Sequence, residues 1–87
     1  MNYAYSLRFK RKLVKLSKVD KKLALKIIDT IENFSKNPYQ NSFRLHKITN
    51  VFPSVWSISV NMSIRIIFSY EGDTIVLHDF GKHEEIY

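Results

Sequence analysis

The residues best suited to chemistry are three histidines, an arginine and a C-terminal tyrosine: His46, His78, His83, Arg65 and Tyr87. Histidine exchanges a proton near neutral pH and so can act as general acid or base. Arginine carries a permanent charge on a planar fork that can hold two phosphate oxygens. Tyrosine can stack on a splayed base or donate from its hydroxyl. Together these groups suit metal-independent cleavage of RNA, which needs a base for the 2′-OH proton, an acid for the leaving 5′-oxygen and a cation for the phosphorane.

The residues that other chemistries need are missing. The chain has no cysteine, which excludes disulfides and thiolate metal sites. It has no phosphate-binding or dinucleotide-binding glycine motif and no nucleophilic triad. The histidines are not at metal-ligand spacing, and Asp79, Glu84 and Glu85 lack the arrangement of a metal cage. We therefore expect neither a metal nor a cofactor.

Length and composition predict one folded domain over residues 1–87. A hydrophobic fraction of 45% and an aromatic fraction of 14% are typical of a folded protein rather than a disordered segment. Arg8–Lys12 interrupts any apolar run at the N-terminus, and no stretch approaches the length of a membrane span. We expect a cytoplasmic protein without a signal peptide and without a membrane partner.

Positive charge is concentrated at one end of the chain. Residues 1–26 contain nine Lys or Arg against Asp20 alone, whereas residues 27–87 contain five cations and seven anions. A surface with this balance suits phosphate backbones or an acidic protein partner. A solvated helix face is the other interpretation. We interpret the basic segment as a docking surface rather than the place where chemistry occurs.

The first half of the chain predicts a strand followed by a helical hairpin. Asn2–Tyr5 is the candidate strand, and Ser6 stands where a helix N-cap would accept a backbone N–H. Ser17–Asp20 is the expected break between the helices, with Asp20 as the second cap. Asn37 and Pro38 end the second helix, because proline disfavours helical backbone in the residue before it. Helical spacing marks the apolar positions Phe9, Leu13, Leu16, Leu23, Ala24, Ile27, Ile28, Ile31 and Phe34.

The second half predicts a sheet. Four segments are rich in β-branched and aromatic residues: Phe43–Ile48, Val55–Val60, Ile64–Tyr70 and Thr74–Phe80. Gly72 and Asp73 suit a two-residue hairpin loop. The predicted fold is α+β, with the order β-α-α-β-β-β and the helical hairpin packed on one face of an antiparallel sheet.

Hairpin register decides which strand residues share a face, because side chains alternate along a strand. A three-residue loop, Asn61–Ser63, makes one face of the hairpin wholly apolar through the pairs Val60–Ile64, Ile58–Ile66 and Trp56–Phe68. The opposite, open face then carries Ser57, Ser59, Arg65, Ile67 and Ser69. A two-residue loop would mix the two sets, so the pattern favours the first register.

Extending this register gathers the chemical residues on the open face. Across the Gly72–Asp73 loop, Ile67 would pair with His78 and Arg65 with Phe80, which places His78 and Phe80 on the open face. If Phe43 and Leu45 face the helices, the open face also holds Arg44, His46, Ser57, Ser59, Arg65 and His78. Gly81 would then fold the tail over this face, bringing His83 and Tyr87 to it.

Each of these residues also has a structural explanation. A lone strand histidine is more often a surface or core residue than a catalyst. Arg65 could form an ion pair with Asp79 or Glu84, and Tyr87 could be an apolar plug over the sheet. Their placement together on one predicted face, with the tail returning to it, favours a functional interpretation.

The whole chain resembles the RelE/ParE superfamily of bacterial toxins, and within it the YafQ-like RNase toxins. The order and spacing of seven segments carry the resemblance: Tyr5-Ser6, Asn37-Pro38, Leu45–Ile48, Trp56-Ser57, Val60-Asn61, Ile64–Phe68 and Gly81–Tyr87. The resemblance implies a RelE-like microbial RNase fold. It also implies ribosome-dependent cleavage of messenger RNA in the ribosomal A site and silencing by a co-expressed antitoxin.

The resemblance also assigns roles to individual residues. His46 and His83 match catalytic histidines of YafQ-like toxins, Tyr87 matches their terminal aromatic, and Arg65 matches the arginine that stabilises the transition state in RelE. We expect three further cations to contact RNA: Arg44, Lys47 and Lys82. Departures from the family pattern are compatible with slow or sequence-selective cleavage. Ser59 and Ser63 stand where YafQ-like toxins place a histidine and an aspartate, Ser57 and Ser59 stand where RelE places lysines, and Asn50 replaces a common glycine.

Two other functional classes remain open. ParE relatives share the fold, lack the RNase residues and inhibit DNA gyrase. A non-catalytic module that only binds an antitoxin is the second alternative. Retention of His46, Arg65, His83 and Tyr87 favours the RNase, and a small acidic reading frame beside the gene would support a toxin–antitoxin pair.

Overall fold

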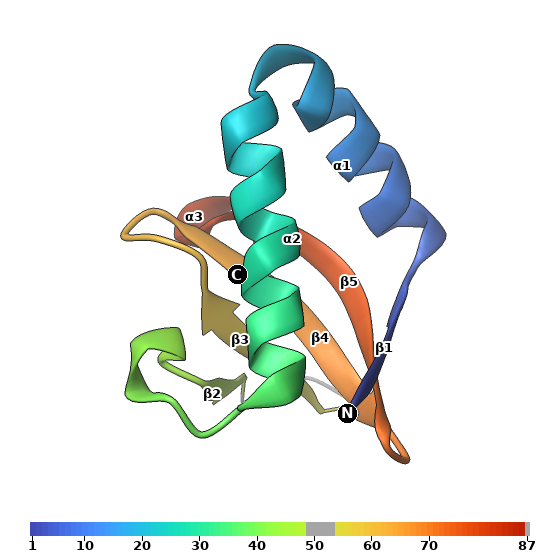
Figure 1. The fold of residues 1–87 in the computed structure, drawn as a ribbon, viewed down its shortest axis with the longest axis vertical. Coiled ribbons are helices and arrows are strands. Elements are labelled where there is room, and N and C mark those ends of the chain that lie inside the picture. The colour runs from blue at the N-terminus through green and yellow to red at the C-terminus, as the bar shows by residue number, and fades with distance from the viewer. Residues whose placement is uncertain (49–53, 87) are drawn as a thin grey trace.

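A computed structural model describes residues 1–48 and 54–86 of the chain. Helices α1 (Leu7–Val19) and α2 (Lys21–Lys36) form a hairpin that follows the short strand β1 (Asn2–Tyr5). The remaining chain contains the 3-10 turn η1 (Asn41–Phe43), four strands, β2 (His46–Ile48), β3 (Val55–Ser59), β4 (Ile64–Glu71) and β5 (Thr74–Lys82), and the short helix α3 (His83–Ile86). Figure 1 shows both long helices on one side of the sheet, which confirms the predicted α+β arrangement.

The two helices begin where the sequence predicts. Ser6 caps α1 by accepting the Phe9 N–H at 3.1 Å, and Asp20 caps α2 by accepting the Leu23 N–H at 3.1 Å. The break between them is narrower than predicted, because α1 continues through Ser17 to Val19. The Ser17 hydroxyl donates to the Val14 carbonyl at 2.6 Å, a local bond that a serine inside a helix can make.

The sheet has the strand order β1-β5-β4-β3-β2. Strand β1 runs parallel to β5, and every other pairing is antiparallel, so the sheet is mixed rather than antiparallel throughout. Four strands follow the helical hairpin, one within each of the four predicted segments and one more than the order β-α-α-β-β-β contains. His46–Ile48 is the edge strand and pairs with β3.

The predicted strand Phe43–Ile48 was wrong in its first half. Phe43 belongs to η1, and Arg44 adopts a left-handed conformation with φ 49° and ψ 50°, which a strand cannot contain. Phe43 nevertheless lies in the core, with its ring edge-on to Phe34 at a centroid distance of 5.3 Å. Only the second half of the segment, from His46, pairs with the sheet.

The β3–β4 hairpin has the predicted register. Trp56 pairs with Phe68, Ile58 with Ile66 and Ser59 with Arg65, and the Val60 N–H donates to the Ile64 carbonyl at 2.9 Å. The apolar face of the hairpin joins the helices in a core of fully buried side chains that includes Phe9, Ile27, Ile31, Phe34, Ile58, Ile66, Phe68, Ile75 and Leu77. The opposite face carries Ser57, Ser59, Arg65 and Ile67.

The predicted β4–β5 register holds only as far as the pair Phe68–Leu77. A register shift then leaves His78 as an extra residue on β5, so Ile67 pairs with Asp79 and Ile66 with Phe80. The predictions that Phe80 lies on the open face and that Arg65 pairs with it were therefore wrong. Phe80 is buried in the core, 5.2 Å edge-on from the Phe9 ring.

Candidate active site

The guanidinium of Arg65 is held in place on the open face of the sheet. Its Nε and Nη2 donate to the Ser57 hydroxyl at 3.1 and 2.9 Å, and Nη2 also donates to the Arg44 carbonyl at 2.8 Å. Ser57 is completely buried and lies on the neighbouring strand, so its hydroxyl has a fixed position. Arg65 therefore presents its fixed positive charge in a defined orientation. The alternative ion pair of Arg65 with Asp79 does not form, because Asp79 contacts the first helix.

Arg44 contributes to the site through its backbone. Its left-handed conformation follows the η1 turn, where the Arg44 N–H donates to the Asn41 carbonyl at 3.0 Å. This turn directs the Arg44 carbonyl to the guanidinium of Arg65, a contact between residues far apart in the chain. The side chain of Arg44 is exposed and brings a second cation to the same place.

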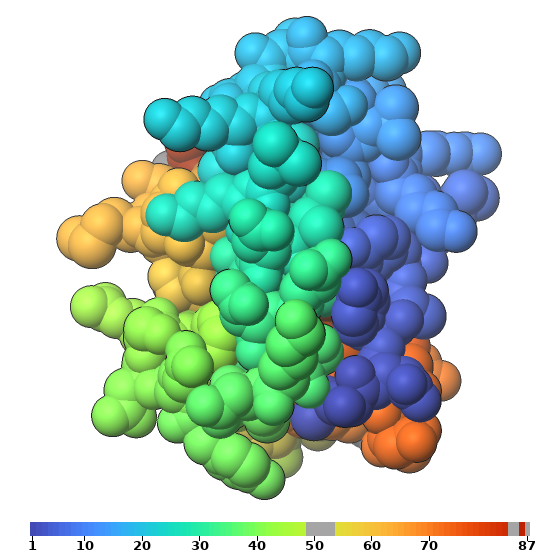
Figure 2. Space-filling view, viewed as in Figure 1, coloured from blue at the N-terminus to red at the C-terminus, as the bar shows by residue number. Residues whose placement is uncertain are grey.

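A hollow of about 290 Å³ lies beside these two arginines. Its walls come from the η1 segment, the end of β3, the β3–β4 loop and β4: Ser42, Arg44, Ser59, Val60, Asn61, Met62 and Arg65. Figure 2 shows the loop tip and the η1 segment projecting from the same side of the molecule, with a depression between them. We call this hollow the arginine hollow.

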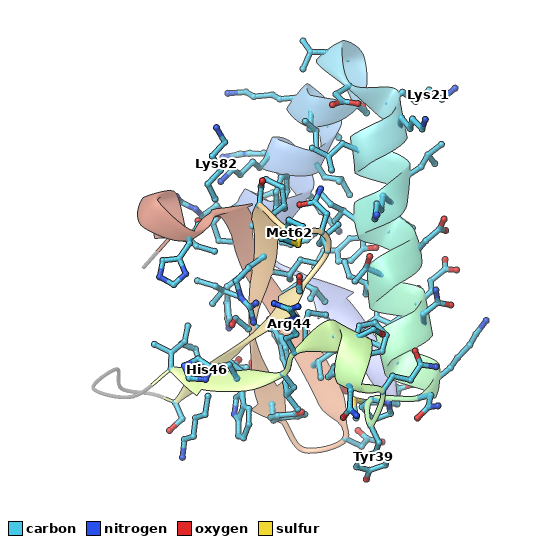
Figure 3. The ribbon with its side chains drawn as sticks, turned by 90° about the vertical axis from the view of Figure 1, so that its left-hand side faces the viewer. Lys21, Tyr39, Arg44, His46, Met62 and Lys82 are labelled. Carbon is cyan, nitrogen blue, oxygen red and sulfur yellow. The ribbon has the colours of Figure 1, made fainter. Side chains whose placement is uncertain are left out.

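A second hollow, of about 340 Å³, adjoins the first and contains one of the predicted catalytic histidines. It is lined by Met62, Ser63, Lys82 and His83, and we call it the histidine hollow. Strand pairing of Ile64 with Lys82 brings the end of β5 to the β3–β4 loop. The two hollows share Met62, which lies between Arg44 and Lys82 in Figure 3.

The tail reaches this site by a different route from the one predicted. Gly81 is buried inside β5, where it pairs with Arg65, so it does not act as the hinge of the tail. The chain turns only after Lys82, where His83 begins the short helix α3. Tyr87, which was expected to return to the site, lies outside the described residues, as does Asn50.

His46 and Lys47 lie on opposite faces of β2. His46 is exposed and pairs with Ser57, which places it on the open face next to the serine that holds Arg65. Lys47 pairs with Trp56, and its Nζ lies 5.9 Å from the centre of the Trp56 ring. The structure thus groups His46 with the arginine side of the site but does not bring Lys47 there.

The loop between β3 and β4 is a tightly bonded turn. Asn61 Oδ1 accepts from the Ser63 and Ile64 N–H groups at 2.8 and 2.7 Å. The Ser59 hydroxyl donates to the Asn61 carbonyl at 2.7 Å. Sequence reasoning used this loop only to set the register and missed Ser42 and Met62 as wall residues. An asparagine after a strand signals such a turn, but no local pattern signals the hollows beside it.

His78 serves the sheet rather than the hollows. Its Nε2 lies 2.7 Å from the Ser69 hydroxyl, and its carbonyl accepts from the Ser6 hydroxyl at 3.3 Å. These contacts fix the extra residue of β5 between β4 and the start of α1. The predicted pairing of His78 with Ile67 was wrong, because Ile67 pairs with Asp79, and His78 does not line either hollow.

Asp79 connects β5 to the basic helix α1. Its carboxylate lies 2.9 Å from Lys12 Nζ and 3.3 Å from Arg8 Nη2. Burial by itself would raise the pKa of Asp79. The hydrogen bonds from Lys12 and the Phe80 N–H, together with the charges of Lys12 and Arg8, outweigh that effect and lower its pKa. Two of the nine N-terminal cations thus have a structural role.

Among the side chains that the structure describes, no three His, Asp or Glu are grouped so that they could hold a metal ion. Across residues 1–48 and 54–86, no helix is both long and apolar enough to cross a membrane.

The fold is shared with solved bacterial toxins. A metal-bound toxin from Helicobacter pylori matches with a TM-score of 0.80 at 16% identity, over 100% of this chain and 99% of that chain. YafQ from E. coli strain BL21(DE3) matches with a TM-score of 0.78 at 17% identity, over 99% and 97%. The YoeB-YefM complex from Staphylococcus aureus contains a match with a TM-score of 0.76 at 15% identity, over 95% and 97%. No protein-family model and no curated protein matches the chain. Likeness at these identities establishes the fold.

Proposed function

We propose that this chain is a RelE/ParE-superfamily toxin of a type II toxin–antitoxin pair, of the YafQ type, and that it is an endoribonuclease. Its substrate is messenger RNA in the ribosomal A site, and its effect is to inhibit translation in the cytoplasm. The observation that carries the proposal is the oriented guanidinium of Arg65 beside adjoining hollows that contain a histidine and two further cations. The shared fold with YafQ supports it.

The residues of the site match the needs of RNA cleavage by the neighbouring 2′-OH. A base removes the 2′-OH proton, the 2′-oxygen attacks the phosphorus, and the bond from phosphorus to the 5′-oxygen breaks as an acid protonates that oxygen. His83 in the histidine hollow and His46 on the open face supply the groups that exchange these protons. Arg65 stabilises the charge that accumulates on the phosphorane, because its orientation is set before the substrate arrives. Tyr87 is proposed to act with them as the terminal aromatic.

Cations around the hollows are proposed to bind the RNA backbone. Arg44 and Lys82 line the two hollows and can neutralise phosphates on either side of the reacting one. Lys47 lies on the other face of β2. It would therefore contact only the part of the RNA that extends beyond the two hollows. The proposed RNase function therefore rests chiefly on three cations, Arg44, Arg65 and Lys82, and on His46 and His83.

The proposed protein partner is a cognate antitoxin. One solved relative in fold is the YoeB-YefM toxin-antitoxin complex. In this chain the outward side of α1 carries exposed cations and the exposed apolar side chains Leu7 and Val14. Such a surface suits an acidic, amphipathic segment of an antitoxin.

Induction of the protein alone tests this function in cells. Growth should stop, and translated messages should be cut at positions that correspond to the A site, as mapped by primer extension. Arg65→Ala and His83→Ala should restore growth while the purified variants stay folded. Intact messages together with blocked DNA supercoiling would instead identify a gyrase inhibitor.

A further inference from the structure

Met62 is the most exposed large hydrophobic residue within the described parts of the chain, with 94% of its surface accessible. It stands at the tip of the β3–β4 hairpin and lines both the arginine hollow and the histidine hollow. Figure 3 shows it between Arg44 and Lys82, on the side of the molecule that carries the site. A scattered exposed apolar residue is ordinary, but this one lines two adjoining cationic hollows.

The turn that carries Met62 is rigid. After the tip, the Ser63 and Ile64 N–H groups donate to Asn61 Oδ1. Before the tip, the Ser59 hydroxyl donates to the Asn61 carbonyl. These bonds hold Asn61 on one side of the methionine and Ser63 and Ile64 on the other. An apolar side chain on a fixed turn can make a contact without the entropic cost of ordering a mobile loop.

We propose that Met62 is a positioning residue that packs against a nucleobase of single-stranded RNA. The phosphates on either side of that nucleotide then lie in the arginine hollow and the histidine hollow. This inference rests on the proposed RNase function and adds a contact that sets the register of the strand on the site.

Met62, the arginine hollow and the histidine hollow together have the chemistry to bind single-stranded RNA. Cationic grooves that track the backbone, combined with apolar or aromatic contacts to base faces, are the usual means of holding single strands. A thioether is polarizable and packs favourably on an aromatic face. Placing the base on Met62 would direct the reacting phosphate to Arg65 and the next phosphate to Lys82. The strand could then not slide without losing all three contacts.

Binding of a non-cleavable strand tests the contact directly. The probe is a short 2′-O-methyl RNA of mixed sequence, which lacks the attacking hydroxyl, and its affinity is measured by fluorescence anisotropy. Met62→Ala should weaken binding roughly five- to tenfold, the low end of what removal of a base-stacking side chain costs. Met62→Leu should restore most of the affinity. Val19→Ala is the matched control, because Val19 is 84% exposed but lines neither hollow.

Steady-state cleavage of ribosome-bound message supplies the second measurement. Met62→Ala should raise KM by a similar factor and change the preferred base near the cut, with kcat and the urea unfolding midpoint retained. Wild-type affinity in Met62→Ala would overturn the inference, as would failure of the wild-type protein to bind the probe. Binding that depends on Met62 without any cleavage by the wild type would overturn the RNase function and leave the contact standing.

Discussion

At the residue scale, the site depends on how Arg65 is held. The alternation of β3 and β4 predicted that Arg65 would stand among serines, and Ser57 does bind it. The second hydrogen bond, which Arg65 donates to the Arg44 carbonyl, could not be predicted. It requires a left-handed backbone at Arg44, which no local sequence pattern favours for arginine and which the tertiary contact stabilises.

Replacing Arg65 with lysine tests the importance of the planar fork. Lysine keeps the charge but cannot bond the Ser57 hydroxyl and the Arg44 carbonyl in the same way. We expect Arg65→Lys to lower kcat/KM for message cleavage at least about tenfold, which is about 1.4 kcal/mol of transition-state stabilisation. Arg11→Lys on the exposed side of α1 is the control and should cleave normally. Full activity of Arg65→Lys would show that charge alone suffices.

At the element scale, the helices and the β3–β4 hairpin could be predicted, but the end of β5 could not. Helix caps and apolar periodicity are local features of the sequence. The three-residue loop gave the correct register of the β3–β4 hairpin, including the pairs Trp56–Phe68 and Ile58–Ile66. The extra residue His78 breaks the alternation of β5 through contacts distant in sequence. It lets Phe80 enter the core and lets Asp79 reach Lys12, 67 residues away.

The Asp79 cluster makes a stability prediction. Because the pKa of Asp79 is lowered in the folded state, its contribution is present above the ordinary carboxyl pKa and is lost as pH falls through the folded-state value. We expect Asp79→Asn to cost about 1 to 2 kcal/mol of unfolding free energy at neutral pH. The difference from wild type should vanish in acid.

Urea unfolding at a series of pH values measures this effect. Asp29→Asn is the control, since Asp29 is exposed on α2 and should change stability little. A constant gap between Asp79→Asn and wild type across the acid range would contradict the assignment of the effect to the charge of Asp79.

At the scale of the whole molecule, the basic surface of the helices is separate from the candidate active site. The basic helices cover one face of the sheet, as Figures 1 and 2 show, whereas the hollows lie along the end of the β3–β4 hairpin. Composition alone predicted this division, because the positive excess lies within residues 1–26 and the catalytic candidates follow it. It did not predict that the site divides into two hollows, which depends on the shape of a single turn.

The basic surface should contribute to ribosome binding through its charge. We expect the double variant Lys15→Glu and Lys18→Glu to bind purified ribosomes more weakly in co-sedimentation and with a shallower salt dependence, because fewer phosphates are neutralised. Lys36→Glu, a cation of α2 outside this segment, is the control. If the double variant bound ribosomes with unchanged affinity and salt dependence, this surface would have no role in ribosome binding, and only its role in binding the antitoxin would remain.

In vitro cleavage of ribosome-bound message by the purified protein tests the central claim most directly. The comparison is between wild type, His83→Ala and the control Arg11→Lys, with cut sites mapped on the message. We predict A-site cleavage by wild type and the control, and a loss of at least about a hundredfold in His83→Ala, the lower range for a general acid or base. Intact message with the wild-type protein, or equal cleavage by His83→Ala, would contradict the account.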